Sequence, residues 1–291
     1  WQLFTVSIAA QIGVLPISLF YFHQFPGLFM VSNLVIIPFI GVILMSGILV
    51  IVLAVLNILP KFIGELYSGV IGLMNDFVGW ISIQESFLIT EISFSSSLLV
   101  TSYFCIFLGI YLLEKSSFRK WVFFLIAIIS FQICVLYEKQ QVYLTNELVI
   151  FNKSRHTVIG QNKKGVLILY HSLDTISIQN LGTIKEYKIG EKLVNVNFKN
   201  KIPSVLKFKN AYILVIDSLG VYAINGIESP IVLLRTSPKI NLERLIKELQ
   251  PKCIIADASN YKNQVLSWKF ICDKNNIPFT YTQEDGALIL K

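Results

Sequence analysis

The residues of this chain that are able to hold a catalytic metal are few and scattered. It contains three histidines among 291 residues, and only His156 and His171 lie in its C-terminal half. Hydrolysis at a metal centre needs several His and Asp side chains that converge on one or two ions. His171 and Asp174 supply two such ligands at most, and the sequence contains no His-x-His-x-Asp-His motif. We therefore expect no catalytic residue and no metal site.

The cysteines and the glycine pattern of the sequence likewise indicate no metal or nucleotide site. Cys105 and Cys134 lie in apolar segments, and Cys253 and Cys272 lack the spacing of metal ligands. Cys253 and Cys272 form either a disulfide or a pair of free buried thiols, and the sequence favours the free thiols. A glycine-rich loop ending in lysine, which would hold a nucleotide, is also absent from the sequence. No cofactor is expected, and any motor must be a separate protein.

Polar residues and prolines inside apolar segments form a second group of candidates. Gln11 precedes Pro16 in the first apolar segment, and Asn33 precedes Pro38 in the next. Amides in membrane helices often only bridge neighbouring helices, which is the role expected of Gln132. Because Gln11 and Asn33 share their segments with prolines, these four residues are predicted to line a transport pathway.

Those residues must be positioned by membrane-spanning helices. No Asp, Glu, Lys or Arg occurs between Trp1 and Pro60, and 54% of the chain is hydrophobic. A span needs about 20 apolar residues, which predicts four spans, at Leu3–Phe22, Phe39–Leu59, Ile92–Leu113 and Trp121–Tyr137. The segment from Phe25 to Pro38 is too short to cross alone, so a half-helix or re-entrant segment is expected there.

Residues 61–81 predict an amphipathic helix. Apolar residues recur at three- and four-residue spacing, whereas Lys61, Glu65, Ser68, Asn75 and Asp76 share the opposite stripe. Such a helix either lies flat in the membrane interface, which the pattern favours, or lines a polar cavity. In the second case Glu65 and Asp76 belong to the pathway.

Charge divides the chain into two predicted domains. Residues 1–137 hold four basic and five acidic side chains, for a net charge of −1, whereas residues 138–291 hold 21 basic and 13 acidic, for a net charge of +8. Lys115, Arg119 and Lys120 lie in one short loop, which the positive-inside rule assigns to the cytoplasm. This places domain 138–291 outside the cytoplasm. The chain is expected to be the later part of a longer protein.

The basic half predicts a layered α+β domain. Strands are expected at 142–151, 166–170, 184–189, 193–198 and 211–216, and then at 231–234, 252–256, 279–282 and 287–290. A helix capped by Asn241 should end at Leu249 before Pro251, and Asn260 should cap a second one. Strands followed by alternating helices and strands favour a domain of packed layers.

The run from Ala9 to Leu44 closely resembles the membrane domain of the ComEC family of competence channels. The family pattern of Ala-Gln-x-Gly-x-x-Pro, Phe-His-x-Phe and Asn-Leu-x-x-x-Pro is met at Ala10, Gln11, Gly13, Pro16, Phe22, His23, Phe25, Asn33, Leu34 and Pro38. The C-terminal half resembles that family's metallo-β-lactamase-like domain, through KELQPKCIIADASNY and the run from Ile277 to Leu290. The resemblance implies a multi-pass helical membrane domain followed by an αββα sandwich.

The resemblance also implies a channel that carries single-stranded DNA through the inner membrane during natural transformation. Membrane lipid, other competence proteins and a separate motor would be its partners, and it would form a possible homo-oligomer. Hydrolysis is not expected, because Arg235, Thr236 and Ser237 stand where such domains carry His-His-Gly-Ser. The domain is interpreted as a relative that kept the fold and lost the metal.

A basic domain without catalysis is suited to binding a phosphate backbone. Arg155, Lys163, Lys164 and Arg235 are the predicted contacts, and exposed aromatic side chains would stack on unpaired bases. Two other functions stay open. One is the transport of another polyanion or a lipid, and the other is a metal-dependent phosphodiesterase, which the missing ligands disfavour.

Overall fold

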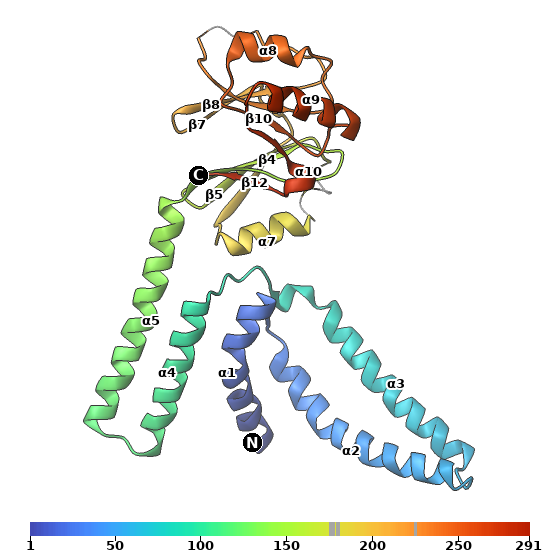
Figure 1. Ribbon diagram of the computed structural model, residues 1–291. Coiled ribbons are helices and arrows are strands. Elements are labelled where there is room, and N and C mark those ends of the chain that lie inside the picture. Colours follow the sequence, from blue (N-terminus) through green and yellow to red (C-terminus); the bar gives the residue numbers. More distant parts are fainter. Residues whose placement is uncertain (175–177, 179–180, 224–225) are drawn as a thin grey trace. The chain divides into compact units, whose positions relative to one another are not determined.

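The computed structural model describes residues 1–174, 178, 181–223 and 226–291. It divides into two compact units, Trp1–Tyr137 and Glu138–Lys291 (Figure 1). The first unit is built from long apolar helices. In chain order its elements are α1 (Gln2–Phe22), β1 (Phe25–Pro26), α2 (Phe29–Val55), α3 (Lys61–Ile83), a 3-10 turn (Glu85–Phe87), β2 (Leu88–Ile89), α4 (Ser96–Glu114) and α5 (Phe118–Leu144).

Five of these helices, α1 to α5, are long and apolar enough to cross a membrane, whereas four spans were expected. The prediction of a re-entrant segment at Phe25–Pro38 was wrong, because α2 runs unbroken for 27 residues with Pro38 inside it. Proline removes one backbone hydrogen bond. In an apolar medium the rest of the helix keeps its bonds, since no water competes for them. The amphipathic segment becomes α3, the fifth candidate span.

The α1–α2 connection pairs with the segment between α3 and α4. His23 ends α1 in the left-handed conformation (φ 54°), and Phe25 and Pro26 pair with Ile89 and Leu88. The backbone N–H of Ile92 donates to the carbonyl of His23 at 2.8 Å. The Phe-His-x-Phe-Pro motif therefore joins two connections at the same end of the helices. Successive helices alternate in direction from there (Figure 1).

The second unit holds two five-stranded sheets. The first has the order β12-β3-β4-β5-β6 and the second the order β11-β10-β9-β8-β7. The strands are β3 (Asn146–Ile150), β4 (Val158–Lys163), β5 (Val166–His171), β6 (Asn195–Lys199), β7 (Val205–Phe208), β8 (Ala211–Ile216), β9 (Ile231–Leu234), β10 (Cys253–Ala256), β11 (Phe279–Tyr281) and β12 (Leu288–Leu290), and the helices are α7 (Gly182–Gly190), α8 (Leu242–Leu249), α9 (Lys262–Lys274) and α10 (Thr282–Asp285).

Three apolar clusters show how these layers stack. One joins the two sheets, through residues such as Ile150, Ile213 and Leu233. A second packs Ile184 of α7 on the outer face of the first sheet. A third packs Leu245 and Trp268, from α8 and α9, on the outer face of the second sheet. The unit is thus a helix, sheet, sheet, helix sandwich, which confirms the predicted αββα class.

Local predictions for this unit were partly right. β8 and β9 occupy the predicted residues, and the side chain of Asn241 caps α8 by accepting the N–H of Arg244. The segment Ile184–Ile189, predicted as a strand, lies in α7. Residues 142–144, also predicted as strand, continue α5. Asn260 does not cap α9, which begins after Tyr261.

Candidate functional site

Three loops of the sandwich meet around one buried carboxylate, that of Asp257. β9 and β10 are parallel, so their carboxyl ends lie at the same edge of the sheet. Polar loops commonly form sites at such an edge. Asp257 directly follows β10, and Thr157, from the loop before β4 of the other sheet, reaches across to it. We call Thr157, Asp257, Ser259 and Asn260 the Asp257 cluster.

The carboxylate of Asp257 accepts hydrogen bonds on both oxygens. Thr157 donates its hydroxyl to Oδ2 at 2.5 Å. Ser259 donates its backbone N–H to Oδ1 at 3.0 Å and its hydroxyl to the same atom. Asn260 adds an amide N–H to Oδ1 at 3.1 Å. Because Thr157 belongs to the first sheet and the other donors to the second, the cluster joins the two sheets.

The same cluster holds the loop between β9 and α8. Thr236 and Ser237 both have φ of 51°, a left-handed backbone conformation that residues other than glycine seldom adopt. The N–H of Thr236 donates to the Ser259 hydroxyl at 2.7 Å, and the N–H of Ser237 donates to Oδ1 of Asn260 at 2.8 Å. The cluster therefore offsets local backbone strain.

The charge of Asp257 is set by burial and by Arg235. Burial of this fully inaccessible side chain raises the pKa of its carboxyl, and the hydrogen bonds from Ser259 and Thr157 and the charge of Arg235 partly oppose that rise. The Nε atom of Arg235 is itself buried, and it has no hydrogen-bond partner in the described part of the chain. The site is thus a buried acid with a guanidinium nearby.

The side chains at this edge do not fit the metal that an αββα hydrolase would need. Among the described residues, no three His, Cys, Asp or Glu side chains lie close enough to share an ion. His171 lies on the same face of β5 as Leu167 and Leu169, which pack in the cluster that contains α7. Its Nδ1 atom is 2.9 Å from the carbonyl oxygen of Leu173. The predicted pair of His171 and exposed Asp174 is therefore not turned toward Asp257.

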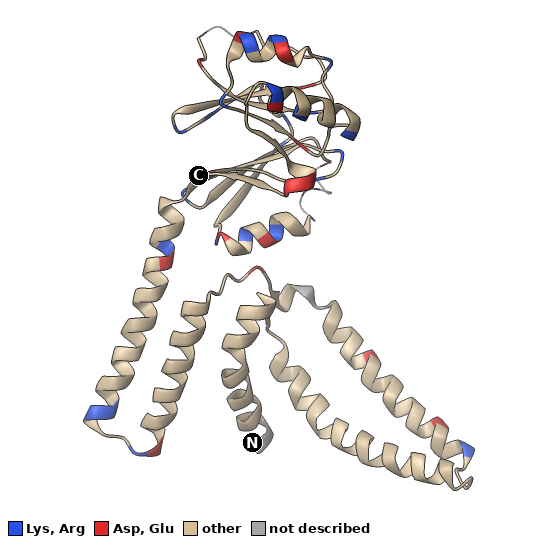
Figure 2. Ribbon diagram, viewed as in Figure 1, with Lys and Arg blue, Asp and Glu red and all other residues tan. Residues whose placement is uncertain are grey.

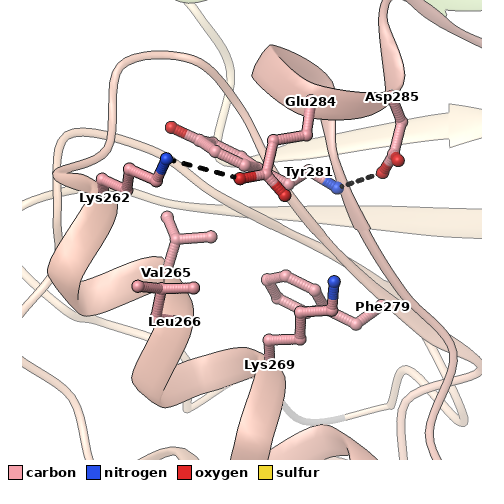
Figure 3. Close-up of a pocket in the computed structure, with 8 residues that line it drawn as sticks. All are labelled: Lys262, Val265, Leu266, Lys269, Phe279, Tyr281, Glu284 and Asp285. Atoms are coloured by element: carbon pink, nitrogen blue, oxygen red, sulfur yellow. Dashed lines mark hydrogen bonds and ion pairs between the residues drawn. The ribbon is translucent and has the colours of Figure 1, made fainter.

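A crevice beside α9 is too small to be a substrate site (Figure 3). Its volume is about 20 Å³, enough for one or two waters. Lys262 and Glu284 face each other across it with 3.9 Å between Nζ and Oε1. The backbone N–H of Tyr281 donates to Asp285 at 2.9 Å. The ion pair links α9 to α10, and the hydrogen bond links β11 to α10.

The four predicted phosphate contacts fall at two places. Arg235 follows β9, and exposed Arg155 donates its backbone N–H to the carbonyl of Ala258 at 2.9 Å, so both lie at the edge that holds the Asp257 cluster. Lys163 and Lys164 lie at the β4–β5 turn, at the opposite end of those strands. Lys164 donates to the Tyr143 hydroxyl at 3.0 Å. The structure therefore does not bring the four side chains together.

Gln11 and Pro16 flank the residue through which α1 contacts α4, Gly13. Pro16 is buried and removes the donor that the carbonyl of Ile12 would otherwise have. One residue further on, the carbonyl of Gly13 accepts the Tyr103 hydroxyl of α4 at 3.0 Å. The motif thus has a clear packing role. Gln11 is half-buried midway along α1.

Asn33 is separated in depth from Gln11, whereas Pro38, about 14 Å along α2 at 1.5 Å per residue, is near the same depth. Asn33 lies in the first turns of α2, near the α1–α2 connection, whereas Gln11 is about 17 Å from that end of α1 at 1.5 Å per residue. Below Asn33, α2 and α3 enclose an apolar cavity of about 310 Å³ lined by Val35, Phe39, Ile43, Val70, Leu73, Met74 and Phe77. Its chemistry suits a lipid acyl chain rather than DNA.

Glu65 and Asp76 are brought together on one face of α3. At 100° per residue, an arc of about 120° holds only polar residues and glycines over most of the helix; these are Lys61, Gly64, Glu65, Ser68, Gly72, Asn75, Asp76, Gly79 and Ser82. We call this set the α3 stripe. The opposite face packs on α2, where the Tyr67 hydroxyl donates to the carbonyl of Ile43 at 3.2 Å.

Five helices able to span a membrane, followed by an αββα domain, define the class of this chain as a membrane protein with a hydrolase-like domain. The competence protein family matches residues 1–116, and the ComEC C-terminal domain matches residues 148–291. The chain therefore belongs to the ComEC family, and it is a membrane protein of competence-related DNA uptake. No curated protein and no solved structure matches it.

The Asp257 cluster was not predicted from the sequence. A signal was available, because the run Asp257-Ala-Ser-Asn260 is polar and directly follows a strand of buried apolar residues. Thr157 gave no such signal, since it lies 100 residues from its partner. The four cysteines are free, so the disulfide left open for Cys253 and Cys272 is not formed.

Proposed function

We propose that the helices of this chain form part of a channel through which single-stranded DNA crosses the inner membrane. The observation that carries the proposal is the α3 stripe. In a membrane-spanning helix, acidic and amide side chains on one face are costly unless they border water or protein. Glu65, Asn75 and Asp76 are exposed on the face turned away from α2. A water-filled conduit along that face would account for them.

The composition of the stripe suits passage rather than retention of a polyanion. Small residues such as Ser68 and Gly72 leave the surface open, and the acids Glu65 and Asp76 repel phosphates. Conduction requires that a permeant binds weakly enough to leave. The α3 stripe contains no arginine, which is consistent with a DNA strand that slides along it without being held.

The positions of the basic residues support an extracytoplasmic soluble unit. The spans alternate in direction, so the α2–α3 and α4–α5 connections lie at the same side (Figure 2). Lys61, Lys115, Arg119 and Lys120 are the basic residues of 1–137, and they all flank those two connections. By the positive-inside rule that side is cytoplasmic. α5 then leaves the cytoplasm, and the unit that follows it meets DNA before it enters.

In this proposal the soluble unit binds or positions DNA and does not cleave it. The support is the replacement of converging metal ligands by the Asp257 cluster, whose donors already occupy both carboxylate oxygens. Other competence proteins, including a separate motor, would pull the strand inward.

The experiment is a steric block of the stripe in a competent host that carries the full-length gene. A Cβ added at Gly72 meets nothing within 4 Å in this chain, so we expect Gly72→Trp to insert at the normal level. We expect transformation to fall at least about tenfold because the conduit is obstructed. Leu66→Trp, at an exposed apolar position of the same helix, is the matched control. Unchanged transformation by Gly72→Trp, at equal protein levels, would show that α3 does not line the path.

A further inference from the structure

The segment that forms one lateral side of the sandwich is basic. β6 ends the first sheet and β7 ends the second, and the five-residue connection 200–204 joins them, so both open edges lie on the same side. Residues 192–216 contain five lysines and neither Asp nor Glu. Four of these lysines are exposed, and we call them the lysine edge: Lys199, Lys201, Lys207 and Lys209.

Three of the four ammonium groups rest over aromatic rings. Lys199 is 5.7 Å from the ring centre of Tyr170, Lys207 is 5.8 Å from that of Tyr212, and Lys209 is 5.5 Å from that of Phe208. These contacts orient the side chains without neutralising them. In the described part of the chain, none of the four lysines forms an ion pair. Asp217, the next acid along, accepts the N–H of Leu219 in its own turn.

The lysine edge starts beside the Asp257 cluster and runs away from it. Lys199 ends β6, which is parallel to β5, and β5 ends next to Thr157, where Ser172 donates to the Thr157 carbonyl. β7 is antiparallel to β8 and leads from this end to the turn at Lys209. At about 3.4 Å per residue, β7 and its turn extend the edge by about 14 Å.

We propose that the lysine edge is a binding track for single-stranded DNA on the soluble unit. The lysines would contact successive phosphates, and the exposed ring of Tyr212 would stack on a base. Asn195, Asn197, Asn200 and Asn210 are exposed along the same segment and offer hydrogen bonds to phosphates and bases. The inference rests on the proposed function for the identity of the polyanion, and it names the surface that meets it.

Two other roles of such an edge are less consistent with the structure. Lysines protect open strands against edge-to-edge pairing, yet the other two edge strands, β11 and β12, contain no lysine. A surface that binds anionic lipid usually also inserts apolar side chains. Between residues 192 and 216 the large hydrophobic side chains recorded as exposed in the described structure are Tyr212, at 37%, and Val194, at 69%, which precedes β6 at the end of that strand opposite Lys199.

The test uses the full chain in lipid nanodiscs of neutral lipid. Binding of a fluorescent oligothymidylate is measured by anisotropy at several salt concentrations. The edge variant carries Lys→Gln at positions 199, 201, 207 and 209. The control variant carries Lys→Gln at 185, 247, 252 and 269, which are exposed elsewhere on the same unit. Each phosphate contact contributes about 0.7 to the salt slope for single strands.

We expect the edge variant to bind at least about tenfold more weakly than the control, with a slope of log K against log salt reduced by about 2 to 3. Equal weakening in both variants would overturn the proposal, as would an edge variant within about twofold of the wild type. Preferential loss of binding to phosphatidylserine vesicles, with oligothymidylate binding intact, would assign the edge to lipid instead. If the Gly72→Trp block fails while the edge still binds DNA, the channel proposal fails and the edge assignment stands.

Discussion

Replacement of Asp257 by alanine tests whether the Asp257 cluster holds the sandwich together. The substitution removes the acceptor of the Ser259 backbone N–H and leaves the Thr157 hydroxyl with only a 3.4 Å contact to the Ser259 hydroxyl. Asn260 still donates to the carbonyl of Leu234, and the Ser259 hydroxyl still accepts the N–H of Thr236. Each buried orphan costs about 1–3 kcal/mol, and loss of a desolvated charge returns part of this. The expected net loss is about 2–4 kcal/mol.

Hydrogen exchange of the full chain in nanodiscs measures this loss locally. Amides of β9 and β10 should exchange roughly 30- to 700-fold faster in Asp257→Ala, since 1.4 kcal/mol is a factor of ten. Asp257→Asn keeps one acceptor oxygen and turns a donor toward the Thr157 hydroxyl, so it should stay close to the wild type. Exchange in Asp257→Ala within about threefold of the wild type would refute the reasoning.

The same residue predicts a pH dependence with a defined sign. Burial raises the pKa of Asp257 above its ordinary value, so the folded chain holds this proton more tightly than the unfolded chain. Its contribution to the free energy of unfolding therefore falls as pH rises from the unfolded to the folded pKa, and it is constant above that. Relative to Asp257→Asn, the wild type should gain protection as the solution is acidified through this window. An equal pH slope in both proteins would contradict the assignment.

Three smaller predictions follow from single contacts. Gly47→Ala places a Cβ against the Tyr67 hydroxyl and should lower the melting temperature of the solubilised protein by loosening α2 from α3. Tyr67→Phe in the same chain should partly restore it. Burial raises the pKa of the Cys272 thiol to about 12, so peptide mapping should find it unlabelled by maleimide at pH 8 until the unit unfolds. Asn241→Ala removes the cap of α8 and should lower the free energy of unfolding by about 1 kcal/mol.

The sequence identified elements that have one strong local signal. β9 occupies the predicted residues because a buried apolar run is bounded by Pro230 and Arg235. The cap of α8 was predictable because Asn241 acts on its own first turn. In the membrane unit, hydropathy identified most of the spanning segments. The predicted break at Pro38 was wrong, because one missing hydrogen bond does not end a helix in an apolar medium.

The remaining features depend on contacts between distant segments. Ile184–Ile189 alternates too weakly to distinguish strand from helix, and its packing under the first sheet decides for α7. The Asp257 cluster depends on Thr157, which only the meeting of two sheets brings near. The lysine edge likewise exists because β6 and β7 are both edge strands. Spacing along the chain carries none of this information.

Site-specific crosslinking of DNA in transit tests the central claim most directly. A photoreactive amino acid is placed in the full-length protein at Ser68, within the α3 stripe, or at Leu66, on the exposed apolar face of the same helix. During transformation with labelled DNA, the channel account predicts a single-stranded adduct at Ser68 and none at Leu66. Equal adducts at both positions, or an adduct at Leu66 alone, would contradict it.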